Sequence, residues 1–145
     1  MTARLVIVST LLLLLGSPAA SAKYGASVTA RTLCNPDKIA RTNAWVDCLR
    51  LEISRSESAL AGLITKTVAK MGTADMLDQP KRSENITLFK ELQSQWLKLR
   101  DEDCKAYAAH SAGLGFGAAQ FNLECVLNET VSRVRTLSTR YDIPQ

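Results

Sequence analysis

The sequence predicts an all-α fold: a small three-helix bundle or helical hairpin array stapled by two disulfides. Apolar residues recur at helical spacing in three long segments, and no segment between residues 40 and 140 shows sustained strand alternation. The chain also carries four cysteines, and its N-terminal segment is typical of an exported protein. An even number of cysteines in a small exported domain indicates disulfides.

The beginning of the chain has the three regions of a secretory signal. Arg4 precedes a largely apolar run of 11 residues from Leu5 to Leu15, and the small residues Ala20-Ser21-Ala22 follow. A run of that length is too short to span a bilayer comfortably, since about 20 residues are needed. We therefore expect residues 1–22 to be a signal peptide that is cut after Ala22, and the alternative is an uncut N-terminal anchor.

The remaining residues, 23–145, are enough for one domain with a core, which we place at about residues 34–140. They carry 17 basic against 14 acidic residues, a net charge of +3 without a Lys/Arg block, so we expect no nucleic-acid partner. They contain no apolar stretch long enough for a membrane helix, so we expect no membrane span after cleavage. The predicted location is the periplasm or the extracellular medium.

The first helix is predicted from about Thr42 to Met71. Its apolar positions are Trp45, Leu49, Ile53, Leu60, Leu63, Ile64, Val68 and Met71. Thr42 or Asn43 can cap its beginning, and Gly72 can end it. The segment from Gly72 to Arg82 contains Pro80 and several polar residues, which predicts a loop.

The second helix is predicted from Ser83 to about Ala109, and three glycines between residues 113 and 117 separate it from the third, Ala118 to Arg140. The expected apolar face of the second helix is Ile86, Phe89, Leu92, Trp96, Leu99 and Tyr107. The expected apolar positions of the third helix are Leu123, Val126, Val131, Val134 and Leu137. Pro144 lies beyond its end.

The four cysteines allow three disulfide pairings. We favour Cys34–Cys48 with Cys104–Cys125, because each pair flanks a plausible loop. Zinc is the rival interpretation, but the chain has no Cys-x-x-Cys pair and a single histidine, so we predict no metal and no cofactor.

One face of the second helix is unusual, because the spacing brings together Gln93, Trp96, Arg100 and Cys104. A large ring, a forked cation and a sulfur on one face suggest a helix held by packing, a polar contact and a covalent bond. Trp96 is interpreted as a core anchor, with a ligand-stacking role as the alternative. Arg100, Asp101 and Arg133 are candidates for an ion-pair network that sets the helix register. For Asp101, the alternative interpretation is that it simply lies on a solvated face. Gln93 and Thr130 are candidates for hydrogen bonds across the helix interface.

These residues resemble a known family. The pattern Gln93-x-x-Trp96-x-x-x-Arg100-Asp101-x-x-Cys104, followed by Cys125-x-x-x-x-Thr130-x-x-Arg133-x-x-x-Leu137, is similar to the LprI-type lysozyme-inhibitor domain. The resemblance implies a bacterial envelope domain, helical and cysteine-bridged. It also implies protein binding and inhibition of lysozyme, with a lysozyme or another envelope protein as the partner.

The chain departs from the family pattern in two respects. The family often has a Leu-Asn pair and a tyrosine in its first helix, whereas the corresponding residues here are Leu60, Ala61 and Ile64. An inhibitor of the strongly basic C-type lysozymes is expected to present an acidic surface, and this chain is basic overall. A non-inhibitory structural or interaction module is therefore the alternative function. No catalytic triad or convergent carboxylate pair is visible, so we predict no enzyme and no catalytic residue, and the oligomeric state is left open.

Overall fold

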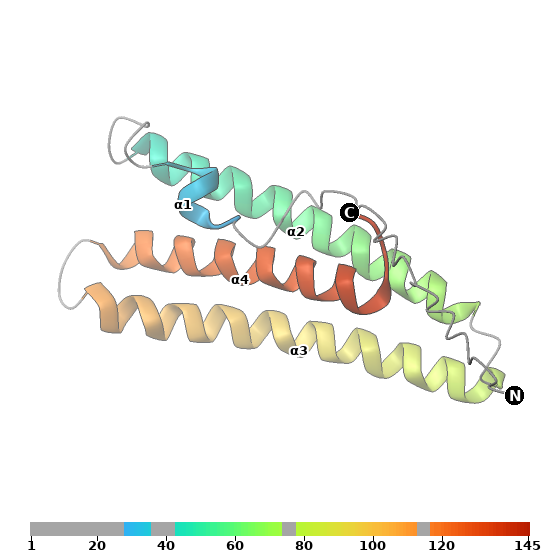
Figure 1. The fold of residues 1–145 in the computed structure, drawn as a ribbon. Coiled ribbons are helices and arrows are strands. Elements are labelled where there is room, and N and C mark those ends of the chain that lie inside the picture. The colour runs from blue at the N-terminus through green and yellow to red at the C-terminus, as the bar shows by residue number, and fades with distance from the viewer. Residues whose placement is uncertain (1–27, 36–42, 74–77, 113–116) are drawn as a thin grey trace, which may run out of the picture.

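The computed structural model describes residues 28–35, 43–73, 78–112 and 117–145. Over these residues the chain forms the helices α1 (Ala30–Leu33), α2 (Asn43–Gly72), α3 (Gln79–Ala112) and α4 (Ala118–Tyr141), with no strand (Figure 1). The prediction of an all-α fold stapled by two disulfides is confirmed. The predicted signal peptide, residues 1–22, lies outside the described residues. None of the helices described is both long and apolar enough to cross a membrane.

Helix α4 is the centre of the molecule. It lies between α2 and α3 and packs against both, whereas α2 and α3 touch each other much less (Figure 1). The core therefore forms on both sides of α4. Its buried apolar members include Leu49, Leu60 and Leu63 from α2, Phe89 from α3, and Leu127, Val131, Val134 and Leu137 from α4.

The buried face of α2 includes two hydroxyl side chains. Ser56 and Thr67 are completely buried. The Ser56 hydroxyl donates to the Ile53 carbonyl at 2.9 Å, and the Thr67 hydroxyl donates to the Leu63 carbonyl at 2.8 Å. Because both hydroxyls are satisfied within the helix, they can lie in the core without the cost of an unpaired polar group.

Helix α3 begins earlier than the sequence predicted. The prediction of a loop from Gly72 to Arg82 is therefore wrong for its last four residues, which are helical. The helix starts at Gln79 rather than Ser83, with Pro80 in its first turn. The Asp78 carboxylate accepts a hydrogen bond from the Lys81 backbone N–H at 3.0 Å. Proline is tolerated in a first turn, where backbone N–H groups have no helical partner, and aspartate caps those groups well. Pro80 therefore begins the helix instead of marking a loop.

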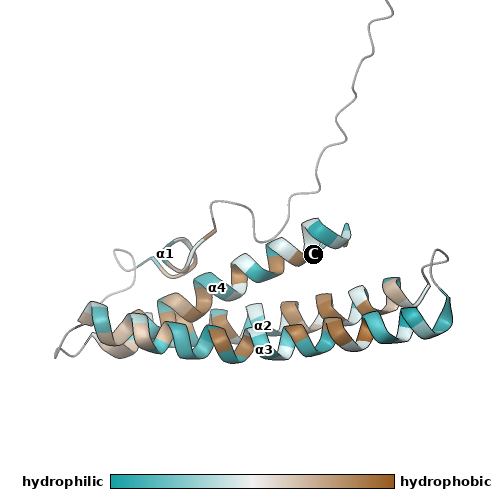
Figure 2. Cartoon of the chain, turned by 90° about the horizontal axis from the view of Figure 1, so that it is seen from below, coloured by the Kyte–Doolittle hydropathy of each residue, from teal (hydrophilic) through white to brown (hydrophobic). Residues whose placement is uncertain are grey.

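The buried face of α3 also differs from the predicted one. Leu92, Leu99 and Tyr107 were expected in the core, but 48%, 64% and 51% of their surfaces are exposed. The buried residues of this helix are Phe89, Gln93, Arg100, Cys104 and Ala108. Viewed from below, α3 shows hydrophobic and hydrophilic residues alternating along its outer side (Figure 2). A polar network and a disulfide, rather than the leucines, orient this helix.

Helix α4 ends at a reversal that adds one residue to the core. Asp142 adopts a left-handed conformation with φ of 48°. The Ile143 N–H then donates to the Ser138 carbonyl at 3.0 Å, and the Ser138 hydroxyl donates to the Ile143 carbonyl at 2.6 Å. This C-terminal cap turns the chain back, so that Ile143 is only 7% exposed.

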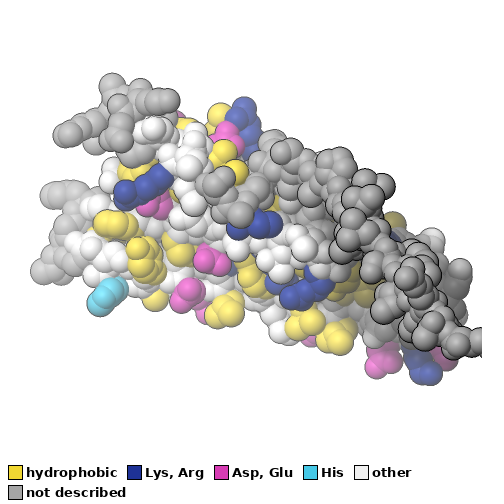
Figure 3. All heavy atoms as spheres, viewed as in Figure 1, with side chains coloured by type: hydrophobic (Ala, Val, Ile, Leu, Met, Phe, Trp, Pro, Cys, Tyr) yellow, Lys and Arg dark blue, Asp and Glu magenta, His cyan; other side chains and the backbone are white. Residues whose placement is uncertain are grey.

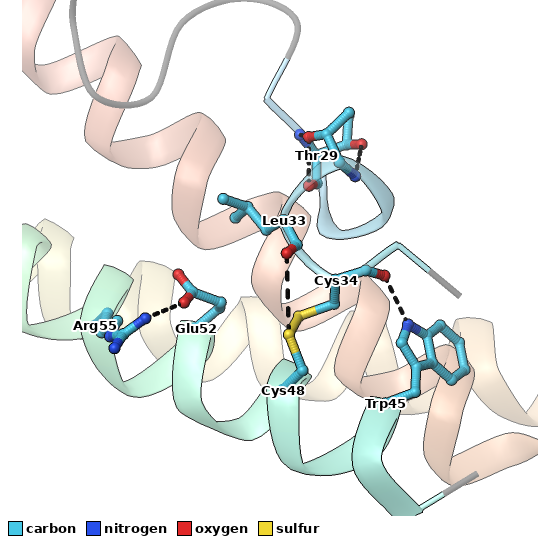
Figure 4. Close-up of a disulfide and its surroundings, with 8 residues drawn as sticks. Thr29, Leu33, Cys34, Trp45, Cys48, Glu52 and Arg55 are labelled. Atoms are coloured by element: carbon cyan, nitrogen blue, oxygen red, sulfur yellow. Dashed lines mark hydrogen bonds and ion pairs between the residues drawn. A yellow bond between two sulfur atoms is a disulfide. The ribbon is translucent and has the colours of Figure 1, made fainter. Parts of the chain in front are cut away.

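The favoured disulfide pairing is confirmed. Cys34 joins Cys48 and Cys104 joins Cys125, with Cα–Cα distances of 5.8 and 5.4 Å. The first disulfide holds α1, a four-residue helix that the sequence did not predict, against the beginning of α2 (Figure 4). The Trp45 indole N–H strengthens this attachment by donating to the Cys34 carbonyl at 2.9 Å.

Candidate functional site

The buried cation Arg100 lies where the three long helices meet. Its side chain is only 5% exposed. It donates to Asp101 from Nε at 2.9 Å and from Nη2 at 2.7 Å, and Nη2 also lies 2.9 Å from Glu57 Oε1 on α2. Nη1 donates to the Thr130 hydroxyl on α4 at 2.7 Å. Two carboxylates and a hydroxyl thus compensate a charge whose isolation from water would otherwise be costly.

The Thr130 hydroxyl links this cation to the backbone of α4. It accepts from Arg100 and donates to the Val126 carbonyl at 2.6 Å. Thr130 is completely buried. Its hydroxyl therefore uses both its donor and its acceptor capacity, as a buried polar group must.

A second polar link joins α3 to α4, about two turns from Arg100 on α3 and about one turn from Thr130 on α4. The Gln93 side-chain oxygen accepts from Arg133 Nε at 3.1 Å and from Arg133 Nη2 at 2.7 Å. The Gln93 amide nitrogen donates to the Phe89 carbonyl at 3.3 Å. Gln93 and Thr130, both considered for bonds across the interface, thus each pair with an arginine of the other helix and not with one another.

Trp96 lies close to both arginines. The guanidinium carbons of Arg133 and Arg100 are 5.1 and 5.7 Å from its ring, which places both cations within cation–π range. Burial lowers the pKa of Arg133, and the neighbouring charge of Arg140 lowers it further. Trp96 is partly buried and packs against the core, and it also contacts both cations, which the sequence did not suggest.

The structure thus places the sequence-predicted residues in two groups. Gln93, Trp96, Arg100, Asp101, Thr130 and Arg133 form one continuous network between α3 and α4. Leu137 lies apart from it, 1% exposed in the apolar core. Because hydrogen bonds between specific side chains join α3 to α4 at two points, we interpret this network as structural, setting the register of the two helices.

The sequence departure from the family pattern lies beside the network. A shallow cavity of about 330 Å³ adjoins Arg100 and Asp101, and Ala61 and Ile64 line its α2 side. These two positions carry apolar side chains where the resembled family often has polar ones. The cavity therefore presents an apolar wall to the Arg100 ion pairs in this chain.

A larger groove opens where α3 and α4 are joined by the second disulfide. Its volume is about 560 Å³, and it is lined by Asp103, Ala106, Tyr107 and His110 from α3 and by Glu124, Cys125, Asn128 and Glu129 from α4. We call these residues the hairpin groove. Three of them are carboxylates, although the chain as a whole is basic. Acidic and hydrophobic side chains lie next to one another over this end of α3 and α4 (Figure 3).

The groove has a fixed wall and an open part. Glu124 lies 3.6 Å from Arg31, and the Asn128 side chain accepts from the Ala30 N–H at 2.7 Å, so both hold α1 in place. Among the described residues, Asp103 and Glu129 have no ion-pair partner. These two carboxylates are therefore available to a cationic partner.

An aromatic pair borders the acidic part. The Tyr107 and Phe121 rings meet edge to face, with centroids 6.4 Å apart, and Tyr107 is 51% exposed. Exposed tyrosines are enriched at protein–protein interfaces, so this ring is a candidate contact for a protein partner. Metal binding has no comparable support, because the described parts of the chain contain no cluster of three or more metal-ligating side chains.

The hairpin groove was not among the features predicted from the sequence, because Asp103 and Glu129 are far apart along the chain. The available signal was the predicted Cys104–Cys125 disulfide. Residues next to each cysteine must lie close together once that bond forms, so the acids flanking Cys104 and those near Cys125 could have been placed on a common surface.

Comparison with known proteins matches the chain to a family. The family model described as "Lysozyme inhibitor LprI" matches residues 34–137, which include all four cysteines and the whole polar network. No match was found among curated proteins or among solved structures.

Proposed function

Because this chain belongs to the lysozyme inhibitor LprI family, we propose that it is an exported envelope protein that binds a lysozyme and blocks its activity. The family match over residues 34–137 is the observation that carries this proposal. The two disulfides support export, because such bonds persist in oxidising compartments.

The hairpin groove is the surface that we assign to the lysozyme. Asp103 and Glu129 offer carboxylates that have no ion-pair partner within the described part of the chain, and Tyr107 offers an exposed ring. C-type lysozymes are strongly basic, so opposite charges would favour encounter and orientation at this groove. The acidic surface expected of such an inhibitor is local, which is compatible with the net positive charge of the whole chain.

Inhibition by covering the lysozyme cleft needs a rigid binding surface and no catalytic residue. The Cys104–Cys125 disulfide and the Arg100–Thr130 hydrogen bond both join the helices that form the groove. A surface that is already ordered loses little conformational entropy on binding, so more of the contact energy appears as affinity. The bound protein would then act by covering the lysozyme cleft.

The test is a muramidase assay with the oxidised protein in micromolar excess over lysozymes of several types. We expect inhibition that weakens as salt is added, because the contacts are partly electrostatic. The double variant Asp103→Asn/Glu129→Gln should raise the inhibition constant at least tenfold. The control Asp47→Asn/Asp142→Asn removes the same charge outside the groove and should leave inhibition unchanged.

Two results would contradict this function. Full lysozyme activity in the presence of excess folded protein would exclude inhibition, and co-purification with a different envelope protein would then favour the non-inhibitory interaction module. Equal loss of inhibition in the groove and control variants would show that the groove is not the contact surface.

Export has its own test. Cleavage after Ala22 would leave Lys23 as the first residue of the mature protein. N-terminal sequencing of protein recovered from the periplasm or the medium should therefore begin at Lys23, and a protein retained in the membrane with Met1 present would contradict it.

A further inference from the structure

Three leucines on the outer side of α3 are exposed in a row. Leu88, Leu92 and Leu99 are 52%, 48% and 64% exposed. Their spacings of four and seven residues place them on one side of the helix. A single exposed leucine is ordinary, but an aligned set is typical of a surface that packs against something. We call these three residues the leucine stripe.

Neither α2 nor α4 covers the leucine stripe. At about 100° per residue, the stripe lies about 120° around the axis from the buried residues of α3. Those buried residues are Phe89, Gln93, Arg100, Cys104 and Ala108. Hydrophobic side chains are visible along the α3 edge of the molecule (Figure 3).

The charges beside the stripe follow a regular order. Glu84, Glu91, Lys98 and Lys105 are all exposed and recur every seven residues, so they form a row parallel to the leucines. The first two are acidic and the last two are basic. The row therefore changes sign near residue 94, in the middle of the stripe.

We propose that the leucine stripe is an interface between two copies of this chain, packed with their α3 helices antiparallel about a twofold axis near residue 94. In this arrangement Leu99 of one copy lies opposite Leu88 of the other. Glu91 faces Lys98 of the other copy, and Glu84 faces Lys105. The twofold symmetry forms each of these pairs twice.

The order of charges selects this arrangement over others. A parallel pair would place Glu84 and Glu91 of one α3 beside the same glutamates of the other, and Lys98 and Lys105 beside the same lysines, which is repulsive. Read in the opposite direction, this row places a lysine opposite each glutamate, so it is complementary to a second, antiparallel copy of itself. An unrelated partner would not need this order of charges. A second copy supplies the required charges at the required spacing without further assumption.

Analytical ultracentrifugation of the oxidised protein over a range of concentrations tests the interface. We expect a reversible dimer, and Leu92→Lys should raise its dissociation constant at least tenfold. Leu51 on α2 is 51% exposed and lies outside the stripe, so Leu51→Lys is the matched control and should remain dimeric. A wild-type protein that stays monomeric to millimolar concentration, or equal effects of the two substitutions, would overturn the proposal.

Charge reversal tests the antiparallel direction. Glu91→Lys and Lys98→Glu should each weaken the dimer several-fold, because each places like charges opposite one another. The double variant should recover wild-type affinity, since the reversed charges again face their opposites. A double variant that dimerises no better than the single ones, with helicity unchanged by circular dichroism, would overturn the antiparallel arrangement.

Discussion

At the scale of single residues, Arg100 shows how a buried charge can organise a small domain. Its guanidinium contacts Glu57 on α2, Asp101 on α3 and Thr130 on α4. One side chain thus makes specific contacts with all three long helices. Apolar contacts tolerate small rotations of a helix, whereas hydrogen bonds to a fork of fixed geometry do not. Arg100 therefore determines which side of α3 is buried.

Removing the hydroxyl acceptor of Arg100 should destabilise the protein with little change in shape. Thr130→Val leaves a buried guanidinium donor without its partner, so we expect the free energy of unfolding to fall by about 1–3 kcal/mol. Thr65 is an exposed threonine whose hydroxyl also donates to the carbonyl four residues earlier, at 3.0 Å. Thr65→Val should change that free energy by less than about 0.5 kcal/mol. Urea denaturation of both variants checks the difference, and equal effects would contradict the role of Arg100.

At the scale of elements, α2 and α4 follow their sequence patterns and α3 does not. The predicted limits of α2 and α4 lie within about one residue of those observed at each described end. Both helices bury aliphatic residues at regular spacing, so periodicity indicates their inner faces. Helix α3 buries Gln93 and Arg100 and exposes Leu92 and Leu99, so the same criterion selected the wrong side.

Two neighbouring leucines of α2 provide a direct measure of burial. Leu49 is completely buried, whereas Leu51 is 51% exposed. Leu49→Ala should lower the free energy of unfolding by about 2–5 kcal/mol, because it leaves a cavity in the core. Leu51→Ala should change it by less than about 0.5 kcal/mol. Chemical denaturation at one protein concentration measures both, and a larger effect at Leu51 would contradict the orientation of α2.

The α3–α4 hairpin depends on its disulfide. The bond closes a separation of 21 residues, so in the chain-entropy model its removal costs stability mainly through the unfolded state. The double variant Cys104→Ser/Cys125→Ser should therefore lose about 2–5 kcal/mol of unfolding free energy. Thermal denaturation against the oxidised wild type measures the loss, and an unchanged midpoint would contradict it.

At the scale of the whole molecule, both disulfides lie at one end. That end holds α1, the beginning of α2 and the junction of α3 with α4 (Figure 1). At the other end, among the described residues, α4 is held by non-covalent contacts. Phe89 and Tyr141 meet edge to face at 5.4 Å, and Lys70 donates to the Tyr141 carbonyl at 2.8 Å. Local opening should therefore begin at the end without disulfides.

Hydrogen exchange tests this asymmetry within one helix. Backbone amides at residues 83–87 of α3 should exchange faster than those at residues 100–104, because the latter segment adjoins both the Arg100 network and the disulfide. Mass spectrometry of peptides from the exchanged protein measures the two segments together. Equal protection along α3 would contradict the expected order of opening.

The sequence by itself determined the helical class, the three long helical segments and the resemblance to the LprI family, and it favoured the disulfide pairing that the structure has. These follow from local periodicity, from breakers and from the spacing of cysteines, all of which can be interpreted along the chain. Only the tertiary structure decided between the two faces that the sequence offered for burial on α3, the one with Gln93 and Arg100 and the one with Leu92 and Leu99. It alone decided the pairing of Gln93 with Arg133 and the hairpin groove that combines Asp103 with Glu129. These features depend on how faces of different helices meet. The free energy of packing two helices together includes polar contacts between them. The apolar periodicity along one helix carries no information about those contacts.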